Sequence, residues 1–264
     1  MTAPDEVRAK TLRLLLVCRE LDAARVRKGL TTRAFASRMA MSPAMVNRLM
    51  NGRRRPSRLE IGGLAAIAEV PLERRRVLYE LVEHGEERTW LLEHPDWSPT
   101  RYDTLRAVTA EATALTWFDP LLVPRPLRTP DYHRAVLAAS PALGADEAEA
   151  LLSDLDNDHK MVARVPKATF LMHDRALVHP AVPDEVMRSQ LDSLRRSPHT
   201  VRLVPSTEPH AVESFRVFEL PHYHPVVHLE GESTTLFLEE PSSVRPYLAQ
   251  ATALRSASRE LPAA

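Results

Sequence analysis

The chain has 264 residues, of which 44% are hydrophobic and 27% charged, and its formal net charge is zero. This length favours two domains of ordinary size, and the composition excludes an intrinsically disordered chain. No run approaches the ~18 consecutive apolar residues of a membrane helix, and the charged start of the chain lacks the apolar core of a signal peptide. The one cysteine, Cys18, fits a reducing compartment, so we expect a cytoplasmic protein.

Glycine is scarce, and after Gly85 only Gly144 and Gly231 remain. Phosphate-binding loops and dinucleotide fingerprints need several glycines at fixed spacing, so we expect no nucleotide cofactor, and indeed no cofactor of any kind.

The zero net charge hides an asymmetry between the two parts of the chain. Residues 1–80 contain 17 Lys and Arg against 8 Asp and Glu, which leaves the remainder of the chain acidic by the same amount. Only the first part is therefore expected to be attracted to a polyanion such as nucleic acid.

The first 82 residues predict five helices. The helix around Leu21 ends at Gly29-Leu30, and Thr31 can cap the next one, which runs to Ala40. Ser42-Pro43 opens a third helix by supplying a capping hydroxyl and a proline at the first helical position. The fourth begins at the capping box Ser57-x-x-Glu60, and the fifth begins at Pro71. Two short helices joined by a tight turn are typical of a helix-turn-helix.

The segment that joins the third and fourth helices makes the interpretation more specific. Ser42-Pro43 before the third helix and Asn51-Gly-Arg-Arg-Arg-Pro-Ser after it resemble the Cro/phage-repressor (XRE) class of DNA-binding domain. The resemblance implies that residues 1–82 form a DNA-binding domain whose third helix enters the major groove. Outward residues of that helix are then expected to contact base edges: Pro43, Ala44, Asn47 and Arg48.

A second group of residues is expected to contact phosphates, which supplies affinity without sequence information. Its members are hydroxyl-bearing or basic residues around the helix starts and the basic loop: Thr31, Thr32, Arg33, Ser42, Arg53, Arg54, Arg55 and Arg58. Among all these residues, Arg48 is the leading candidate for reading a base, because a guanidinium can bond guanine through two atoms at once.

Residues 83–101 break the helical periodicity and predict a linker, whose tryptophans favour a partly packed segment. Residues 102–264 predict an α+β domain with a mixed or antiparallel sheet of about five strands. The five predicted strands are rich in β-branched and aromatic residues and begin near Thr169, Thr200, Ser214, Val226 and Thr234. A helix is predicted from Asp103 to Trp117. Aromatic placement suggests a pocket for a small apolar ligand near Trp90, Trp97 and Trp117.

Several segments of this second domain resemble the C-terminal domain of WhiJ-like regulators: Asp119-Pro-Leu-Leu-Val-Pro, Arg128-Thr-Pro-Asp-Tyr-His, Val201-Arg-Leu-Val-Pro and Val227-His-Leu-Glu. In that family the module follows an XRE domain, and the order of parts here is the same. The resemblance implies a regulator that acts with a small acidic partner protein or responds to a small-molecule effector.

Three histidines could hold zinc with an open coordination site: His222, His224 and His228. Pro221 and Pro225 bracket the first two, which favours a hairpin turn instead, and no nucleophile elbow or zinc-binding helix motif is present. We therefore expect neither a metal nor an enzyme.

Three hypotheses follow from the sequence. The leading one is a sequence-specific transcription regulator, nucleoid-associated in the cytoplasm, that binds double-stranded operator DNA as a homodimer on an inverted repeat. In it, the second domain supports dimerisation and senses a ligand or docks a partner. The alternatives are an antitoxin-like interaction module that binds a small acidic partner and regulates its own synthesis, and a metal-dependent hydrolase tethered to DNA.

Overall fold

A computed structural model describes residues 11–94, 102–207 and 213–261. The chain forms two compact units, the first made of Met1–Arg88 with His222–His224 and the second made of Thr89–Pro221 and Pro225–Ala264. Each unit has its own core, and each is described here by itself.

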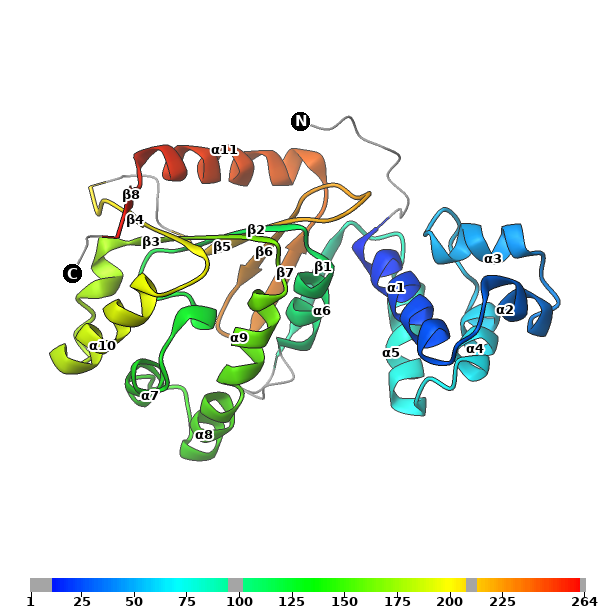
Figure 1. Ribbon diagram of the computed structural model, residues 1–264, viewed down its shortest axis with the longest axis horizontal. Helices are drawn as coiled ribbons and strands as arrows, with labels where there is room; N and C mark the ends of the chain where they lie inside the picture. Colours follow the sequence, from blue (N-terminus) through cyan, green and yellow to red (C-terminus); the bar gives the residue numbers. More distant parts are fainter. Residues whose placement is uncertain (1–10, 95–101, 208–212, 262–264) are drawn as a thin grey trace. The chain divides into compact units, whose positions relative to one another are not determined.

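Five helices form the first unit within its described residues, as predicted (Figure 1). They are α1 (Leu12–Arg27), α2 (Thr32–Arg38), α3 (Pro43–Met50), α4 (Arg58–Ile67) and α5 (Leu72–Glu83). Threonine or serine side chains cap the first four helices, and Ser57 and Glu60 form a reciprocal capping box at the start of α4. The apolar faces meet in a core that includes Phe35, Val46 and Leu49, none of which is exposed.

The first four helices each end with one residue in the left-handed region. Gly29 and Gly52 take this conformation without strain, whereas Ala40 and Glu69 take it with φ of 51° and 53°. In each case the following amide closes the helix end, as when Met41 N–H donates to the Ala36 carbonyl. The turn between α2 and α3 therefore contains an alanine where glycine would be less strained.

The second unit contains both helices and strands. Its helices are α6 (Asp103–Glu111), α7 (Pro130–Ala138), α8 (Ala145–Ser153), α9 (Leu155–Ala163), α10 (Asp184–Arg195) and α11 (Pro241–Ala257), with short 3-10 turns η2 (Arg125–Leu127) and η3 (Asp174–Leu177). Its strands are β1 (Thr89–Glu93), β2 (Ala114–Asp119), β3 (Lys167–His173), β4 (Thr200–Val204), β5 (Phe215–Glu219), β6 (Val226–Glu230), β7 (Thr234–Leu238) and β8 (Arg259–Glu260).

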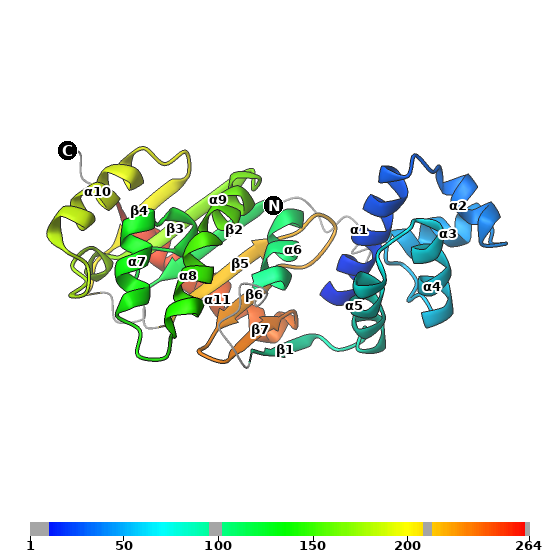
Figure 2. The ribbon, with the colours of Figure 1, turned by 90° about the horizontal axis from the view of Figure 1, so that it is seen from below.

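Within the described residues the strands form one mixed sheet in the order β1-β7-β6-β5-β2-β3-β4-β8. Strands β2, β3 and β4 are parallel, and the other pairings are antiparallel. Helix α11 covers one face, where Phe118, Leu171 and Phe215 pack with Val244 and Leu254. Helices α6 to α10 lie on the other side of the sheet (Figures 1 and 2).

The opposite face of the sheet contains a row of side chains that share one register across seven strands. The row comprises Trp90, Phe237, His228, Arg216, Trp117, Phe170 and Val201. Directly paired residues project from the same face, so these side chains stand next to one another. A charged arginine thus lies in the middle of an otherwise aromatic and aliphatic row.

All five predicted strands form, as β3 to β7, and the described residues add β1, β2 and β8. The helix predicted from Asp103 to Trp117 is wrong beyond Glu111, since Ala114–Asp119 is strand β2. This strand lies between β3 and β5 with Trp117 buried on one face and Phe118 on the other. A strand buried on both faces shows no polar alternation, so its periodicity does not distinguish it from a buried helix.

None of the described helices is both long enough and apolar enough to cross a membrane.

Candidate functional site

Helices α2 and α3 form the two arms of a helix-turn-helix. The Thr31 hydroxyl accepts a hydrogen bond from the Ala34 amide at 3.1 Å, and the Ser42 hydroxyl accepts one from the Met45 amide at 3.1 Å. Both hydroxyl groups, predicted as phosphate contacts, thus first serve as helix caps. Val46 and Leu49 anchor α3 in the core, which fixes the side of the helix that faces solvent.

The four residues predicted to contact bases all lie on that exposed side of α3: Pro43, Ala44, Asn47 and Arg48. The Asn47 Oδ1 accepts a hydrogen bond from the Asn51 side chain at 2.8 Å, which orients the amide. Arg48 is exposed and has no hydrogen-bond or ion-pair partner among the described residues. Its guanidinium is therefore available to an external acceptor.

The arginines predicted to contact phosphates fall into two groups. Arg33, Arg53 and Arg58 are exposed. Arg54 and Arg55 are partly buried, and their intramolecular partners hold the loop between α3 and α4 in place. Arg54 donates to both carboxylate oxygens of Glu60, at 3.1 and 2.6 Å, and Arg55 donates to the Val82 carbonyl at 2.7 Å.

Arg58 pairs with Glu83 and lies over the Tyr79 ring, while Thr32 is partly buried at the start of α2. The pairing of Arg54 lowers the pKa of Glu60, through a hydrogen bond that outweighs partial burial. The basic loop thus combines exposed cations with cations that shape the loop.

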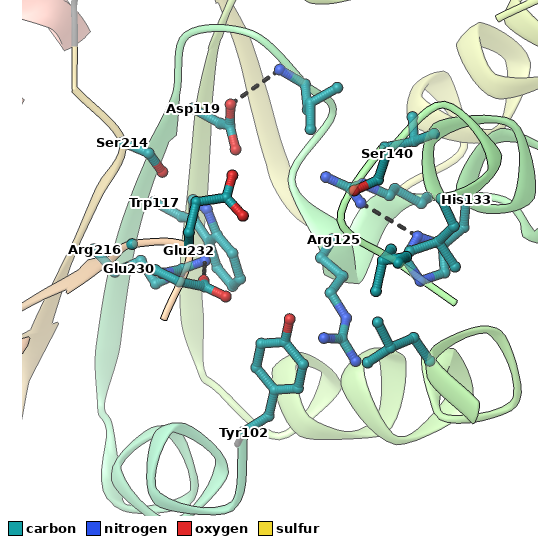
Figure 3. A pocket seen from close by; sticks show the side chains of 17 residues that line it. Tyr102, Trp117, Asp119, Arg125, His133, Ser140, Ser214, Arg216, Glu230 and Glu232 are labelled. Atoms are coloured by element: carbon teal, nitrogen blue, oxygen red, sulfur yellow. Dashed lines mark hydrogen bonds and ion pairs between the residues drawn. The ribbon is translucent and has the colours of Figure 1, made fainter. Parts of the chain in front are cut away.

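A second site lies in the other unit, where residues of the central strands β2, β5 and β6 line a cavity of about 500 Å³ (Figure 3). Strands β2 and β6 end here and β5 begins here, so Asp119, Glu230 and Ser214 lie at the same end of these strands. Apolar side chains form part of the wall, among them Val136, Leu137, Leu143 and Leu151. Ligands of open α/β sheets commonly bind beyond the carboxyl ends of strands, which is where this cavity lies.

Arg216 is the most strongly held of the three arginines in the cavity. Its Nη2 donates to Glu230 at 2.6 Å, its Nη1 donates to His228 Nδ1 at 2.7 Å, and its guanidinium lies 3.9 Å from the centre of the Trp117 ring. Burial is the largest single influence on Glu230 and would raise its pKa, but the charge and hydrogen bond of Arg216, together with Arg125 and His228, outweigh it, and the pKa falls to about 2. Burial and the same guanidinium keep the pKa of His228 well below 6.5, so this imidazole is neutral.

Arg125 is also neutralised within the protein. It forms ion pairs with Asp154, at 3.0 Å, and with Asp158, and it stacks on the Tyr102 ring at 3.6 Å. Arg106 approaches the same two aspartates from α6. This buried network ties η2 to α6 and α9.

Arg128 differs from the other two. It is only 8% exposed, yet it forms no ion pair among the described residues. Its Nε donates to the Val123 carbonyl at 2.7 Å and its Nη1 donates to His133 Nδ1 at 3.2 Å. Burial and the neighbouring arginines lower the pKa of His133 to about 3, so this histidine is neutral and supplies no counter-charge.

The nearby carboxylate of Asp119 does not pair with Arg128 either. One of its oxygens accepts the backbone amides of Leu121 and Leu122, each at 3.0 Å. Burial raises the pKa of this carboxyl group above its ordinary value, which these two hydrogen bonds and the charge of Arg128 only partly oppose.

Of the three tryptophans predicted to frame an apolar pocket, Trp117 lines the cavity and Trp90 packs against Phe237 with ring centres 5.6 Å apart. Trp97 lies outside the described residues. The cavity has one apolar wall, and charged side chains make up much of the remaining lining. The sequence analysis missed the three arginines and Asp119 as a site. Arg125 and Arg128 lie among the prolines at 120, 124, 126 and 130, which was the available signal for these two arginines.

His222 and His224 lie in the hairpin turn between β5 and β6, and His222 has a φ of 59°. His228 is buried in β6 and accepts the hydrogen bond from Arg216. No cluster of three or more His, Cys, Asp or Glu side chains suited to a metal ion occurs within the described part of the chain.

Comparison with known proteins agrees with this geometry. Residues 18–78 match a family model described as a helix-turn-helix domain, which defines the first unit as a DNA-binding type of module and supports DNA-binding regulation. Residues 102–261 match a model described as a domain of unknown function, DUF5753. This match covers more than half of the chain, so the protein belongs to the DUF5753 family. No curated protein matches the chain.

Two of the solved structures that match the chain illustrate how weak the likeness is. One is reported as "Structure of TrmBL2, an archaeal chromatin protein, shows a novel mode of DNA binding", with 12% identity and a TM-score of 0.37 over 75% of this chain and 64% of that one. The chain therefore spans less than two thirds of that relative. The other is NucT from Helicobacter pylori, with 8% identity and a TM-score of 0.39 over 65% of this chain and 98% of that one. Likenesses this low define neither fold nor function.

Proposed function

We propose that the protein is a sequence-specific, DNA-binding transcription regulator of the XRE type, whose second unit is a WhiJ-like sensing module. The observation that supports this most directly is the outward face of α3. Pro43, Ala44, Asn47 and Arg48 are exposed together on one side of a helix that the core fixes in place. A helix with this presentation fits the major groove, and its N-terminal residues then lie nearest the base edges.

In this proposal the work is divided between the two groups of arginines. Arg48 reads a base, and the exposed Arg33 and Arg53 contact phosphates. Arg54, Arg55 and Arg58 act mainly by holding the loop after α3 through Glu60, the Val82 carbonyl and Glu83. Thr31 and Ser42 cap the two helices and orient their amide ends toward the DNA backbone.

A helix-turn-helix monomer contacts few base pairs, so the proposed regulator acts as a homodimer on an inverted repeat with half-sites about 10 bp apart or a multiple of that. The second unit supplies dimerisation and responds to an effector, and the charged cavity is the feature that supports an effector site. A small acidic partner protein that docks on this unit is the second arrangement that the WhiJ resemblance implies. The role is regulatory rather than enzymatic.

The decisive experiment is selection of bound duplexes from a random oligonucleotide pool by the full chain. We expect enrichment of a short motif repeated with two-fold symmetry, and we expect the complex mass to correspond to two chains. A pool that remains random after repeated rounds would contradict sequence-specific binding. Enrichment of a single, unrepeated half-site would retain DNA binding but exclude the dimer.

A further inference from the structure

The cavity of the second unit contains a buried arginine that forms no ion pair within the described part of the chain, although the Asp119 carboxylate lies near enough to favour its charge. Of its three arginines, Arg216 is paired with Glu230 and Arg125 with Asp154 and Asp158. Arg128 has no carboxylate ion-pair partner among the described residues, although it is only 8% exposed. A buried charge without a counter-ion is costly, so a site of this kind is completed by an anion from outside.

The bonds that Arg128 already makes leave donors available. A guanidinium has five N–H groups, and the Val123 carbonyl and His133 Nδ1 engage two of them. Both acceptors are neutral, because burial and the adjacent arginines hold the pKa of His133 at about 3. The remaining N–H groups suit the two oxygens of a carboxylate, which a guanidinium binds with well-matched geometry.

The remaining lining restricts what kind of anion fits. Asp119, Glu230 and Glu232 also line the cavity, so a doubly charged anion such as phosphate would meet about twice the repulsion that a single negative charge meets. The apolar wall includes Leu137 and Leu151, which are 9% and 2% exposed. At about 500 Å³ the cavity falls within the roughly 300–1,000 Å³ typical of small-molecule sites.

From these observations we propose that the cavity binds a small carboxylic acid, whose carboxylate pairs with Arg128 and whose apolar part contacts Leu137 and Leu151. This inference deepens the proposed function and rests on it only in treating the second unit as the sensing module. It names the chemical class of the effector, an organic monoanion with an apolar body.

The test uses the full chain and a panel of straight-chain acids from acetate to decanoate, together with benzoate. Binding is measured by isothermal titration and by the shift of the thermal unfolding midpoint. Hexanamide is the matched neutral control for hexanoate, and inorganic phosphate tests the dianion. We expect at least one acid to bind saturably with one site per chain, and we expect the amide and phosphate to bind at least tenfold more weakly.

Two variants locate the site. Arg128→Gln removes the charge and is expected to weaken acid binding at least tenfold, whereas Arg134→Gln, an exposed arginine on α7 paired with Asp131, is expected to leave it unchanged. Val136→Trp fills the cavity while retaining every arginine, and it is expected to abolish binding. This variant decides the question if Arg128→Gln does not fold.

The proposal is overturned if no acid in the panel binds, if hexanamide or phosphate binds as tightly as the acids, or if Val136→Trp leaves binding intact. Its failure is distinct from that of the proposed function. A chain that selects a DNA motif but binds no acid retains the regulator and loses the effector, and a chain that binds the acid but selects no DNA does the reverse.

Discussion

Arg48 in the first unit and Arg216 in the second place the same guanidinium group in opposite surroundings. Arg48 stands on an exposed helix face with no partner among the described residues, whereas Arg216 is 5% exposed and held by a carboxylate, an imidazole and an indole ring. An exposed cation costs the fold little and is available to a polyanion, whose binding weakens as salt rises. A buried cation is part of the fold, and its removal leaves its partner unpaired.

The comparison predicts its largest effect at Arg216. Replacement by Gln leaves the Glu230 carboxylate buried without its counter-charge and should lower the free energy of unfolding by about 3 kcal/mol. Urea unfolding followed by tryptophan fluorescence measures this, because all three tryptophans lie beyond residue 88. The control Arg134→Gln breaks only an exposed pair and should cost less than about 0.5 kcal/mol. Equal losses from the two variants would contradict the comparison.

The same pair predicts a pH dependence. The pKa of Glu230 is about 2 in the folded protein, below the ordinary value of a glutamate near 4.5. A depressed carboxyl pKa contributes stability that is present above the unfolded value and is lost as pH falls. The stability of the wild type should therefore fall between about pH 4.5 and pH 2, whereas Arg216→Gln, in which burial raises the pKa of Glu230, should not lose stability there, so the difference between the two shrinks as pH falls. A difference that grows over this range would be inconsistent with the ion pair.

Arg48→Ala should leave the fold intact and change DNA recognition. Loss of a base contact is expected to cost ~1–3 kcal/mol on the selected motif and to relax discrimination at one base pair. Fluorescence anisotropy with the motif and its single-base variants measures both effects. Arg38→Ala, which removes an exposed arginine at the end of α2, is the control. An equal loss on every sequence would assign Arg48 to phosphate instead.

Arg33 and Arg54 provide the same comparison, between an exposed and a paired arginine, within the first unit. Arg33 is exposed without a partner among the described residues, so Arg33→Ala should weaken binding to all sequences alike and lower the salt slope by about one unit. Arg54 is committed to Glu60 by two hydrogen bonds. Arg54→Ala should therefore change the salt slope less than Arg33→Ala does. The reverse order would show that the pair with Glu60 opens on DNA.

The smallest expected effect is at Ala40, whose left-handed φ of 51° closes α2. Glycine removes the strain of about 1–2 kcal/mol but increases the entropy of the unfolded chain, so Ala40→Gly should stabilise the first unit by about 0.5–1 kcal/mol. Cys18 lies in α1 and therefore reports on this unit. Its thiol is protected in the folded state, because burial raises its pKa to about 12 and its Sγ donates to the Leu49 carbonyl. Alkylation of native Cys18 should slow several-fold in the variant, and a faster reaction would contradict the strain.

The sequence was sufficient where local chemistry decides structure. Caps at Thr31, Ser42 and Ser57, together with Gly29 and Gly52, mark the ends of short helices, and these signals act over a few residues. The five strands predicted from β-branched and aromatic segments also formed. The exposed face of α3 followed from the same local periodicity, because the buried positions of a helix determine its outward positions.

Only the tertiary structure decided features that depend on neighbours distant in sequence. Strand β2 continues an apolar pattern that fits a helix, and its place between β3 and β5 determines its conformation. The cavity assembles Asp119 and Arg128 with Arg216 and Glu230, although Arg128 and Arg216 lie 88 positions apart in the sequence. The local sequence can show that an arginine lies among apolar residues. Whether a carboxylate lies beside that arginine depends on the packing of strands and helices, so the unpaired charge of Arg128 is visible only in the folded chain.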